Sequence, residues 1–340
     1  MPVYRLPPFK IDETLLASDL TTVIDRSLTI YGVPQAWTHT RGEGVTVAVL
    51  DTGVDVDHPD LAQAVVEAED FTGSSAGSGD RVGHGTHCSG TIGARGRLNG
   101  VAPACRLIHG KVLGDDGSGM DPWIAGGINW AVAHGADVIS GSFGSNTPSP
   151  IMAASIRAAV AQGKFFVFAA GNDHRVGGGN EVDHPAKLRQ GIAVAAVDEN
   201  NRIAPFSSRG PEVDIAAPGV NILSTYPGGG YARMSGTSMA TPFVAGVVAL
   251  CLAKHRKGGA GRTPLDTIEQ LKKHLSATAT DAGAPGFDVD YGFGLIAPGK
   301  LIDAVSGPAD PPAPLPVDVM ALGDFAKDGR MGQLLWRASA

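Results

Sequence analysis

Three side chains in this sequence could together perform nucleophilic chemistry: a serine, a histidine and an aspartate. Ser238 lies in G-T-S-M-A-T-P, at the start of a long apolar helical pattern, so its hydroxyl is the one reactive polar group on a buried helix. A serine hydroxyl is a weak nucleophile at neutral pH and needs a base to take its proton. His84 in G-H-G-T-H could be that base, and Asp51 in D-T-G could orient it.

Each of these residues also has an ordinary structural interpretation. A serine before an apolar run is a favoured helix N-cap, and an aspartate at a strand end is usually a turn or cap residue. D-T-G also forms one half of an aspartic-protease site, but that site needs two such motifs and this chain has one. His84 and His87 have the i, i+3 spacing of two zinc ligands, yet no Cys/His cluster at ligand spacing offers a third ligand.

Asn172 is a fourth candidate, in A-A-G-N. An asparagine after glycine is often a turn former, because it tolerates left-handed backbone geometry. Its side-chain amide could instead donate a hydrogen bond to an oxyanion that develops at the end of a strand.

The elements that must position these residues alternate between strand and helix. Apolar runs of β type and helical patterns follow one another along the chain, which predicts an α/β fold: a three-layer, doubly wound, mostly parallel central sheet with helices on both faces. The predicted strands are 45–50, 105–113, 136–140, 164–169 and 191–197, and the predicted helices are 84–93, 124–134, 151–162, 238–254 and 263–279. Ligands of such folds bind beyond the carboxyl ends of the strands, where Asp51 and Asn172 fall.

The sequence divides into three parts. Residues 1–26 form a short N-terminal extension, 27–306 the main domain, and 307–340 a proline linker with a tail too short for a core of its own. Thr263 and Pro264 predict the start of the last long helix, and 291–296 a final short strand or turn.

Composition limits the classes of function and partner. The 340 residues carry a formal net charge of −7, which argues against a nucleic-acid partner, and no apolar run approaches the roughly 20 residues of a membrane span. The three cysteines leave at least one unpaired, and the N-terminus lacks the apolar core of a signal peptide. We expect a cytoplasmic protein, or a secreted one if a leader has been removed.

The sequence resembles the subtilisin-like serine proteases over roughly residues 28–306. Four blocks carry the resemblance: V-A-V-L-D-T-G-V-D, G-H-G-T-H-C-S-G-T, A-A-G-N and G-T-S-M-A-T-P-F-V-A-G. The order Asp, His, Ser is that of the subtilisins. The resemblance implies a serine endopeptidase with Asp51, His84 and Ser238 as the triad and Asn172 as oxyanion donor. Cys88 after His87 is similar to the proteinase K branch, and the short extension to intracellular subtilisins.

The resemblance also implies where a polypeptide substrate binds. Two extended segments would flank it, namely Gly117-Ser118-Gly119 and Ser142-Phe143-Gly144. Alignment puts Asp183 at the base of the first specificity pocket and Asp121 at the rim of the fourth. Acids there predict a preference for Arg or Lys before the cut; the alternative is that both are solvated surface acids.

Calcium is a further implication, as a structural ion and not a catalytic cofactor. The loop A-R-G-R-L-N-G-V-A-P is shorter than the calcium loop of many relatives, so we expect the usual site not to form although Asp60 is present. A different site is predicted at Asp214, with the carbonyls of Arg189 and Gly191 as further oxygen ligands.

The extension itself is a predicted partner of the site. Leu6 to Phe9 would occupy the substrate groove as an inhibitor, and its removal after Arg26 would activate the enzyme. Two other functions remain open on the same scaffold: a non-catalytic peptide-binding module, disfavoured because all four chemical residues are intact, and a peptide ligase or macrocyclase that keeps water from the acyl-enzyme.

Overall fold

The structure is a computed structural model that describes residues 2–19, 23–257 and 264–304. The proposed linker and tail, 307–340, and the predicted cap Thr263 lie outside the described residues.

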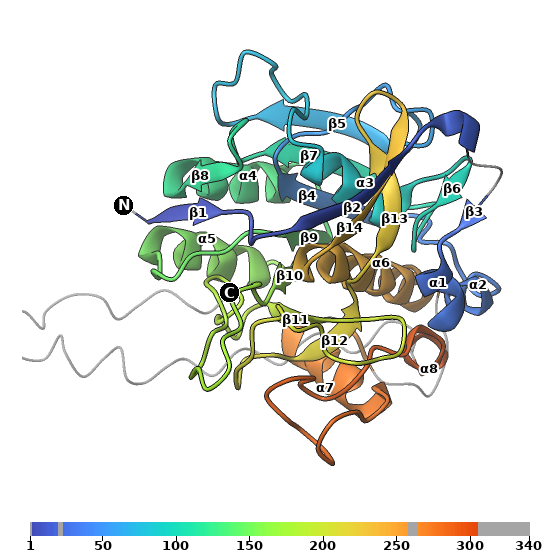
Figure 1. The fold of residues 1–340 in the computed structure, drawn as a ribbon, viewed down its shortest axis with the longest axis vertical. Coiled ribbons are helices and arrows are strands. Elements are labelled where there is room, and N and C mark those ends of the chain that lie inside the picture. Colours follow the sequence, from blue (N-terminus) through green and yellow to red (C-terminus); the bar gives the residue numbers. More distant parts are fainter. Residues whose placement is uncertain (1, 20–22, 258–263, 305–340) are drawn as a thin grey trace, which may run out of the picture. The chain divides into compact units, whose positions relative to one another are not determined.

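A seven-stranded sheet forms the centre of the molecule, with the strand order β12-β11-β10-β9-β4-β7-β5 and every neighbouring pair parallel (Figure 1). The predicted α/β fold is therefore confirmed. The chain enters at β4, goes to the β5 edge and back to β7, and then crosses to β9, so β4 lies at the switch point of the topology. The strands are β4 (Thr46–Asp51), β5 (Val65–Asp70), β7 (Arg106–Lys111), β9 (Val138–Gly141), β10 (Phe165–Ala169), β11 (Ile192–Val197) and β12 (Ile215–Pro218).

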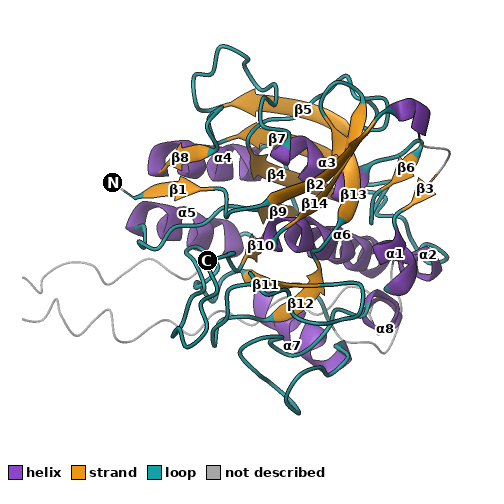
Figure 2. Cartoon of the chain, viewed as in Figure 1, coloured by secondary structure: helices purple, strands orange, loops and turns teal. Residues whose placement is uncertain are grey.

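Helices cover both faces of this sheet (Figure 2). On one face, α4 (Asp121–Ala133) and α5 (Pro150–Val160) enclose one apolar core. On the other face, α3 (His84–Gly93) and α6 (Thr237–Arg256) enclose a second. Because β4 is covered on both sides, all its residues are buried, which explains the uninterrupted apolar run in the sequence.

Helix α6 contributes many of the apolar residues of the second core. Among the helices in the described ranges it alone has the length and apolar composition of a membrane-crossing segment, so the expectation that no apolar run approaches that length was wrong; 94% of that window is buried within the protein. Its thin side accepts a neighbour at Gly246, where a Cβ atom would lie 2.6 Å from the Cβ of Val101.

The N-terminal extension contributes strands to three small sheets. β1 (Val3–Arg5) pairs with β8 (Ser118–Met120), and β3 (Val23–Ile24) pairs with β6 (Leu98–Asn99). Between them, β2 (Lys10–Leu15) joins the hairpin of β13 (Ile222–Tyr226) and β14 (Gly230–Ser235) as its third strand.

The remaining helices are short and lie near the ends of the domain: η1 (Ala17–Asp19), α1 (Arg26–Ile30), α2 (Val33–Ala36), α7 (Ile268–Thr278) and α8 (Pro298–Asp303).

The predicted start of the last long helix was wrong. Helix α7 begins at Ile268, because Thr267 forms a capping box with Gln270, and Pro264 lies outside the helix. Residues 291–296 make isolated bridges at Gly292 and Leu295, so this segment is a turn and not a strand.

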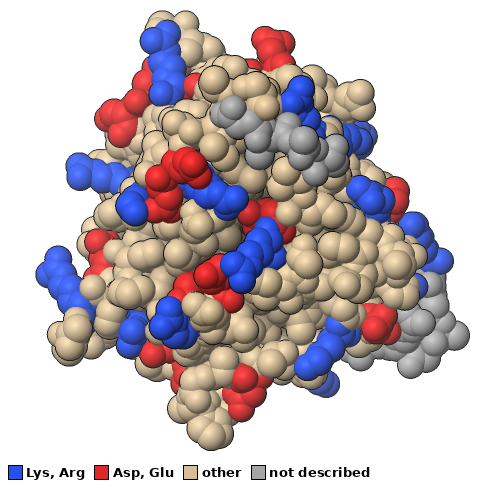
Figure 3. All heavy atoms as spheres, turned by 45° about the vertical axis from the view of Figure 1, so that its right-hand side comes forward, with Lys and Arg blue, Asp and Glu red and all other residues tan. Residues whose placement is uncertain are grey.

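Charged side chains of both signs are interspersed on the face of the molecule drawn in Figure 3. The three cysteines are buried and form no disulfide.

Candidate active site

Asp51 and His84 form a hydrogen-bonded pair at the carboxyl end of β4. Oδ1 of Asp51 accepts hydrogen bonds from the Thr52 amide at 2.7 Å and from Nδ1 of His84 at 2.8 Å, and both side chains are fully buried. Burial opposes charge on either group, but each charge stabilises the other: the pKa of Asp51 lies below its usual value, and that of His84 lies well above its own. The geometry favours an imidazole whose Nδ1 carries the proton, leaving Nε2 free to act as a base.

The loop before α3 is held in place by Asp80. Oδ1 of Asp80 accepts hydrogen bonds from the Gly83 amide at 2.8 Å and the Thr52 hydroxyl at 2.9 Å, and Oδ2 from the Thr86 amide at 2.8 Å. Gly83 has φ of 90°, and a Cβ atom there would lie 2.2 Å from the Tyr226 ring, so only glycine fits before His84. These contacts fix the start of α3 and hence the imidazole.

Ser238 is the second residue of α6 and is fully buried. Its backbone oxygen accepts from the hydroxyl of Ser142 at 3.1 Å, and the sulfur of Cys88 lies 3.5 Å from that oxygen and 3.8 Å from Nδ1 of His84. The serine is thus brought beside the Asp51–His84 pair. Oγ of Ser238 and Nε2 of His84 each have no hydrogen-bond partner among the described residues, so the bond between serine and base is not formed in this structure.

Asn172, after β10, points its amide group at the extension. Nδ2 donates to the carbonyl oxygen of Pro8 at 2.7 Å, whereas Oδ1 accepts from the Thr237 amide at 2.9 Å and the Thr237 hydroxyl at 2.8 Å. Because Thr237 uses the amide oxygen, the NH₂ group is left to donate to a carbonyl beside Ser238.

The extension lies between the two segments predicted to bind substrate. The amide and carbonyl of Arg5 pair with those of Gly144 at 3.0 and 2.9 Å, and the Leu6 amide donates to Gly117 at 3.1 Å. Ser118 and Gly119 pair with β1, and the Phe143 ring packs edge-on against Tyr4 at 6.0 Å. Ser142 differs from the rest, because its side chain bonds to Ser238 and not to the extension.

The two predicted pocket acids are buried, not solvated. Asp183 is 6% exposed, and a Cβ atom on Gly144 or Gly171 would lie 2.4 or 2.7 Å from its Oδ2. Burial, and then the charge of Asp173, raise the pKa of Asp183 to about 6. Asp121 is 2% exposed, and its Oδ1 has no hydrogen-bond partner among the described residues. The pKa of Tyr4 is raised first by the burial of Tyr4 and then by the charge of Asp121.

The carboxylates of Asp60 and of Asp214, the predicted calcium ligand, both have hydrogen-bond or ion-pair partners within the protein. Asp60 accepts from the amides of Arg97 and Leu98 at 2.9 and 2.8 Å and from the Tyr231 hydroxyl at 2.8 Å. Asp214 accepts from the Ala193 amide at 2.8 Å and pairs with the Lys272 ammonium at 2.9 Å.

The predicted ligation by the carbonyls of Arg189 and Gly191 stays a prediction. The amide of Gly191 donates to the carbonyl of Leu188 at 3.1 Å, and the Ala193 amide, two residues further on, donates to Asp214.

The zinc alternative finds no support in the position of His87. Nε2 of His87 bonds to the carbonyl oxygens of Ile222 and Ala232 at 3.0 and 3.2 Å, and burial lowers the pKa of His87 to about 3. Among the described residues, the ligand-type atoms that cluster are those of Asp51, His84 and Cys88, within 4.8 Å of one another, and two of these form the pair described above.

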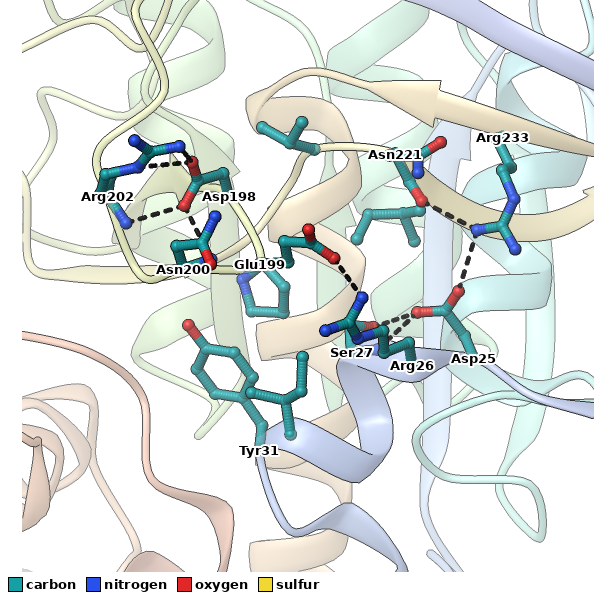
Figure 4. Close-up of a pocket in the computed structure, with 14 residues that line it drawn as sticks. Asp25, Arg26, Ser27, Tyr31, Asp198, Glu199, Asn200, Arg202, Asn221 and Arg233 are labelled. Atoms are coloured by element: carbon teal, nitrogen blue, oxygen red, sulfur yellow. Dashed lines mark hydrogen bonds and ion pairs between the residues drawn. The ribbon is translucent and has the colours of Figure 1, made fainter.

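A cavity of about 530 Å³ lies away from this site, where the extension joins the domain (Figure 4). Its charged lining residues are paired: Arg26 with Glu199 at 2.6 Å and Arg202 with Asp198 at 2.8 Å. Asp25, only 4% exposed, caps α1 through the Ser27 amide at 2.8 Å and accepts from the Leu223 amide at 3.2 Å. Asp25 is therefore built into the domain and not only into the extension.

Several positioning residues escaped the sequence analysis. Asp80, four residues before His84, could have been noticed as an acid in the turn before a helix. His109 and Lys111, polar residues inside an otherwise apolar strand, were the other available signal.

A doubly wound parallel sheet with an acid–histidine pair at the switch point and a serine at a helix start defines a serine hydrolase of the Asp, His, Ser order. A family model described as the Subtilase family matches residues 42–294, and the chain belongs to this family of serine endopeptidases.

Known relatives extend over most of the chain. It is 43% identical over 259 residues to Subtilisin E of Bacillus subtilis strain 168 and likewise to Subtilisin of Bacillus pumilus; the match covers 75% of this chain, 65% of the former and 90% of the latter. It is 42% identical over 262 residues to a thermostable alkaline protease of Halalkalibacterium halodurans, covering 76% of this chain and 68% of that protein.

Proposed function

We propose that this chain hydrolyses peptide bonds in polypeptides through an acyl-enzyme on Ser238. The observation that carries the proposal is that three groups lie together at one edge of the sheet. They are the hydrogen-bonded Asp51–His84 pair, Ser238, and the Asn172 amide, which donates to a backbone carbonyl. The identity to subtilisins over three quarters of the chain supports it.

The mechanism follows from the roles that these groups can take. Nε2 of His84 removes the proton of Ser238 as Oγ attacks the carbonyl carbon, then returns it to the leaving amine. Asp51 fixes the tautomer and stabilises the imidazolium. The Asn172 amide and the backbone N–H of Ser238, at the positive end of α6, stabilise the oxyanion. Water then repeats the sequence to release the acid.

The extension acts as an inhibitor in this proposal. It presents the Pro8 carbonyl to Asn172 and packs the Phe9 ring on His84, with the ring centroids 5.0 Å apart. Strand pairing stops across Pro7 and Pro8, which lack N–H groups, and resumes at β2. With the serine–histidine hydrogen bond absent, the Pro8–Phe9 peptide bond occupies the site without being activated for attack.

The preference for a basic residue before the cut rests on Asp183. This carboxyl is buried beside Gly144, the residue that pairs with the bound extension, so a cation entering from the substrate would meet it with little competing water. The charge of Asp121 acts on Tyr4, which lies four residues before Pro8, the residue whose carbonyl meets Asn172. A donor-bearing side chain, basic or phenolic, suits that position.

A serine-reactive fluorophosphonate tests the proposed function. We expect it to label the chain at Ser238 and to abolish cleavage of a random peptide pool, and we expect Ser238→Ala to resist both. Peptide binding without labelling would indicate a binding module, and joined instead of cut peptides would indicate a ligase.

A further inference from the structure

A second histidine lies behind the Asp51–His84 pair. His109 is on β7, and the parallel register sets Val49 of β4 opposite His109 and Asp51 opposite Lys111. Side chains two residues apart on a strand share a face, so His109, Lys111 and Asp51 all project toward α3. The imidazole is fully buried there.

Gly85 of α3 shows how close the two side chains come. A Cβ atom on Gly85 would lie 3.0 Å from Cε1 of His109 and 3.2 Å from Cβ of Asp51. Both side chains therefore approach the same residue of the helix, the one directly after His84.

Each of these side chains has an unused polar atom. Oδ1 of Asp51 accepts two hydrogen bonds, but Oδ2 is buried without a partner. In His109, Nδ1 lies 3.1 Å from the hydroxyl of Ser89, and Nε2 is buried without a partner. Buried polar atoms are rarely left unpaired, because desolvation without a new hydrogen bond is costly.

The contact between the Ser89 hydroxyl and Nδ1 of His109 allows two proton arrangements, because a hydroxyl can donate or accept. In the arrangement in which the hydroxyl donates, the hydrogen lies on Nε2, so neutral His109 offers a donor and Asp51 Oδ2 an acceptor. Burial lowers the pKa of His109 to about 4. The charges of Asp51 and Asp80 act to raise this pKa and that of Lys111 acts to lower it, and the ring is neutral at pH 7. The ammonium of Lys111 is held by Thr52, Gly79 and Asp115.

We propose that His109 is a positioning residue of the catalytic site, whose Nε2–H donates to Oδ2 of Asp51 through one buried water. The donor fixes the rotation of the carboxylate, so that Oδ1 stays aligned with His84, and it withdraws part of the negative charge that His84 senses. This proposal rests on the proposed function, since it gives Asp51 its catalytic role.

The first test does not depend on activity. In the full chain carrying Ser238→Ala, with ¹⁵N-labelled histidine, we expect the ring-nitrogen shifts of His109 at pH 7 to show the Nε2–H tautomer. The Nδ1–H tautomer, or a charged ring, would overturn the proposal.

The second test is kinetic and uses the full chain at its steady rate. His109→Leu keeps the volume and removes the donor; we expect kcat to fall roughly threefold to tenfold with little change in KM, and the acid limb of the kcat/KM profile to rise by about half a pH unit. His109→Gln, whose amide can donate from the same reach, should restore most of both.

Val49→Ala is the matched control for packing, because Val49 faces His109 across the strand pair. It should lower the melting temperature without moving the acid limb. If the wild type is active and the acid limb of His109→Leu equals that of the wild type, the positioning role is refuted and the proposed function is not. If the wild type is inactive, the proposed function is contradicted instead.

Discussion

The side-chain amide of Asn172 donates a 2.7 Å hydrogen bond to the carbonyl oxygen of Pro8, 164 residues earlier in the chain. A group suited to stabilise a developing oxyanion is thus occupied by a carbonyl of the protein's own N-terminus. The amide is held in this orientation by Thr237, immediately before Ser238.

Asn172→Ala should lower kcat by about 10²–10³ with little change in KM, because the lost hydrogen bond strengthens mainly in the transition state. This magnitude is carried over from subtilisin, where it was established. Thr237→Val removes only the hydroxyl that bonds to Oδ1 and should cost less. Steady-state kinetics on one peptide check both, and equal losses would contradict the assignment.

Asp51→Asn should lower kcat at pH 7 by about 10³–10⁴, because an amide stabilises the wrong tautomer of His84. The pKa of His84, held above its usual value by Asp51, should fall in this variant. Since the base must be neutral, the acid limb of the residual activity should lie at a lower pH than that of the wild type. A pH–rate profile from pH 5 to 9 checks this, and an unmoved acid limb would argue against the pair as the working base.

Removal of residues 1–15 should raise the initial rate and abolish any lag, because β1, Pro8 and Phe9 leave the groove together. Removal of residues 1–26 should also raise the initial rate but lower the melting temperature. It deletes the Asp25 cap of α1, worth about 1 kcal/mol, and leaves the buried Leu223 amide without its acceptor.

Progress curves and thermal unfolding separate these two truncations. Equal initial rates in the full chain and both variants would refute inhibition by the extension. Equal melting temperatures in the two truncations would show that Asp25 is dispensable and that a cut after Arg26 suits the domain.

Asp183 should give a pH-dependent preference. Its pKa is raised to about 6, so the carboxylate that attracts Arg forms only as the pH rises through that value. In the variant that lacks residues 1–15, the ratio of kcat/KM for an Arg peptide over a Phe peptide should climb between pH 5 and 7. Asp183→Asn should flatten the ratio, and a strong Phe preference at pH 8 would remove the idea.

The same group has a consequence for stability. Because the folded-state pKa of Asp183 exceeds that of an unfolded aspartate, the folded chain binds more protons between about pH 4 and 6, and stability falls as the pH rises through about 6. The change is at most about 3 kcal/mol. Asp183→Asn should therefore be more stable than the wild type at pH 8 but not at pH 4, as measured by denaturant unfolding.

Chelation should leave the melting temperature within about 2 °C, a shift of about 1 kcal/mol for a domain of this size, because donors of the protein already satisfy Asp60 and Asp214. Lys272→Met removes the ammonium beside Asp214 and should make the melting temperature rise with added calcium. A large loss on chelation of the wild type would instead support the calcium site predicted at Asp214.

The sequence was most informative where a local pattern decides the structure. Strands such as β4 and β11 are buried throughout and mostly apolar, and the rule for strand ends then places Asp51 and Asn172 at one edge. It was least informative at the start of α7: Thr263 with Pro264 predicted the start, whereas in the structure Thr267 and Gln270 form the capping box, a pattern that the sequence analysis did not use.

Contacts between distant segments were beyond reach for a different reason. The proximity of His109 to Asp51 depends on the register of β7 against β4, and the ion pair of Lys272 with Asp214 depends on how α7 packs. Neither follows from spacing along the chain.

The pairing of the extension with both β8 and β14 means that one covalent link maintains two weak strand associations. While the link is intact, the effective concentration of the inhibitory segment at the groove is in the millimolar range typical of short tethers. A single cut on the C-terminal side of β2 would turn that segment into a free peptide, diluted by the solution and competing with every other polypeptide present. Activation would then need one cut per chain and would be hard to reverse.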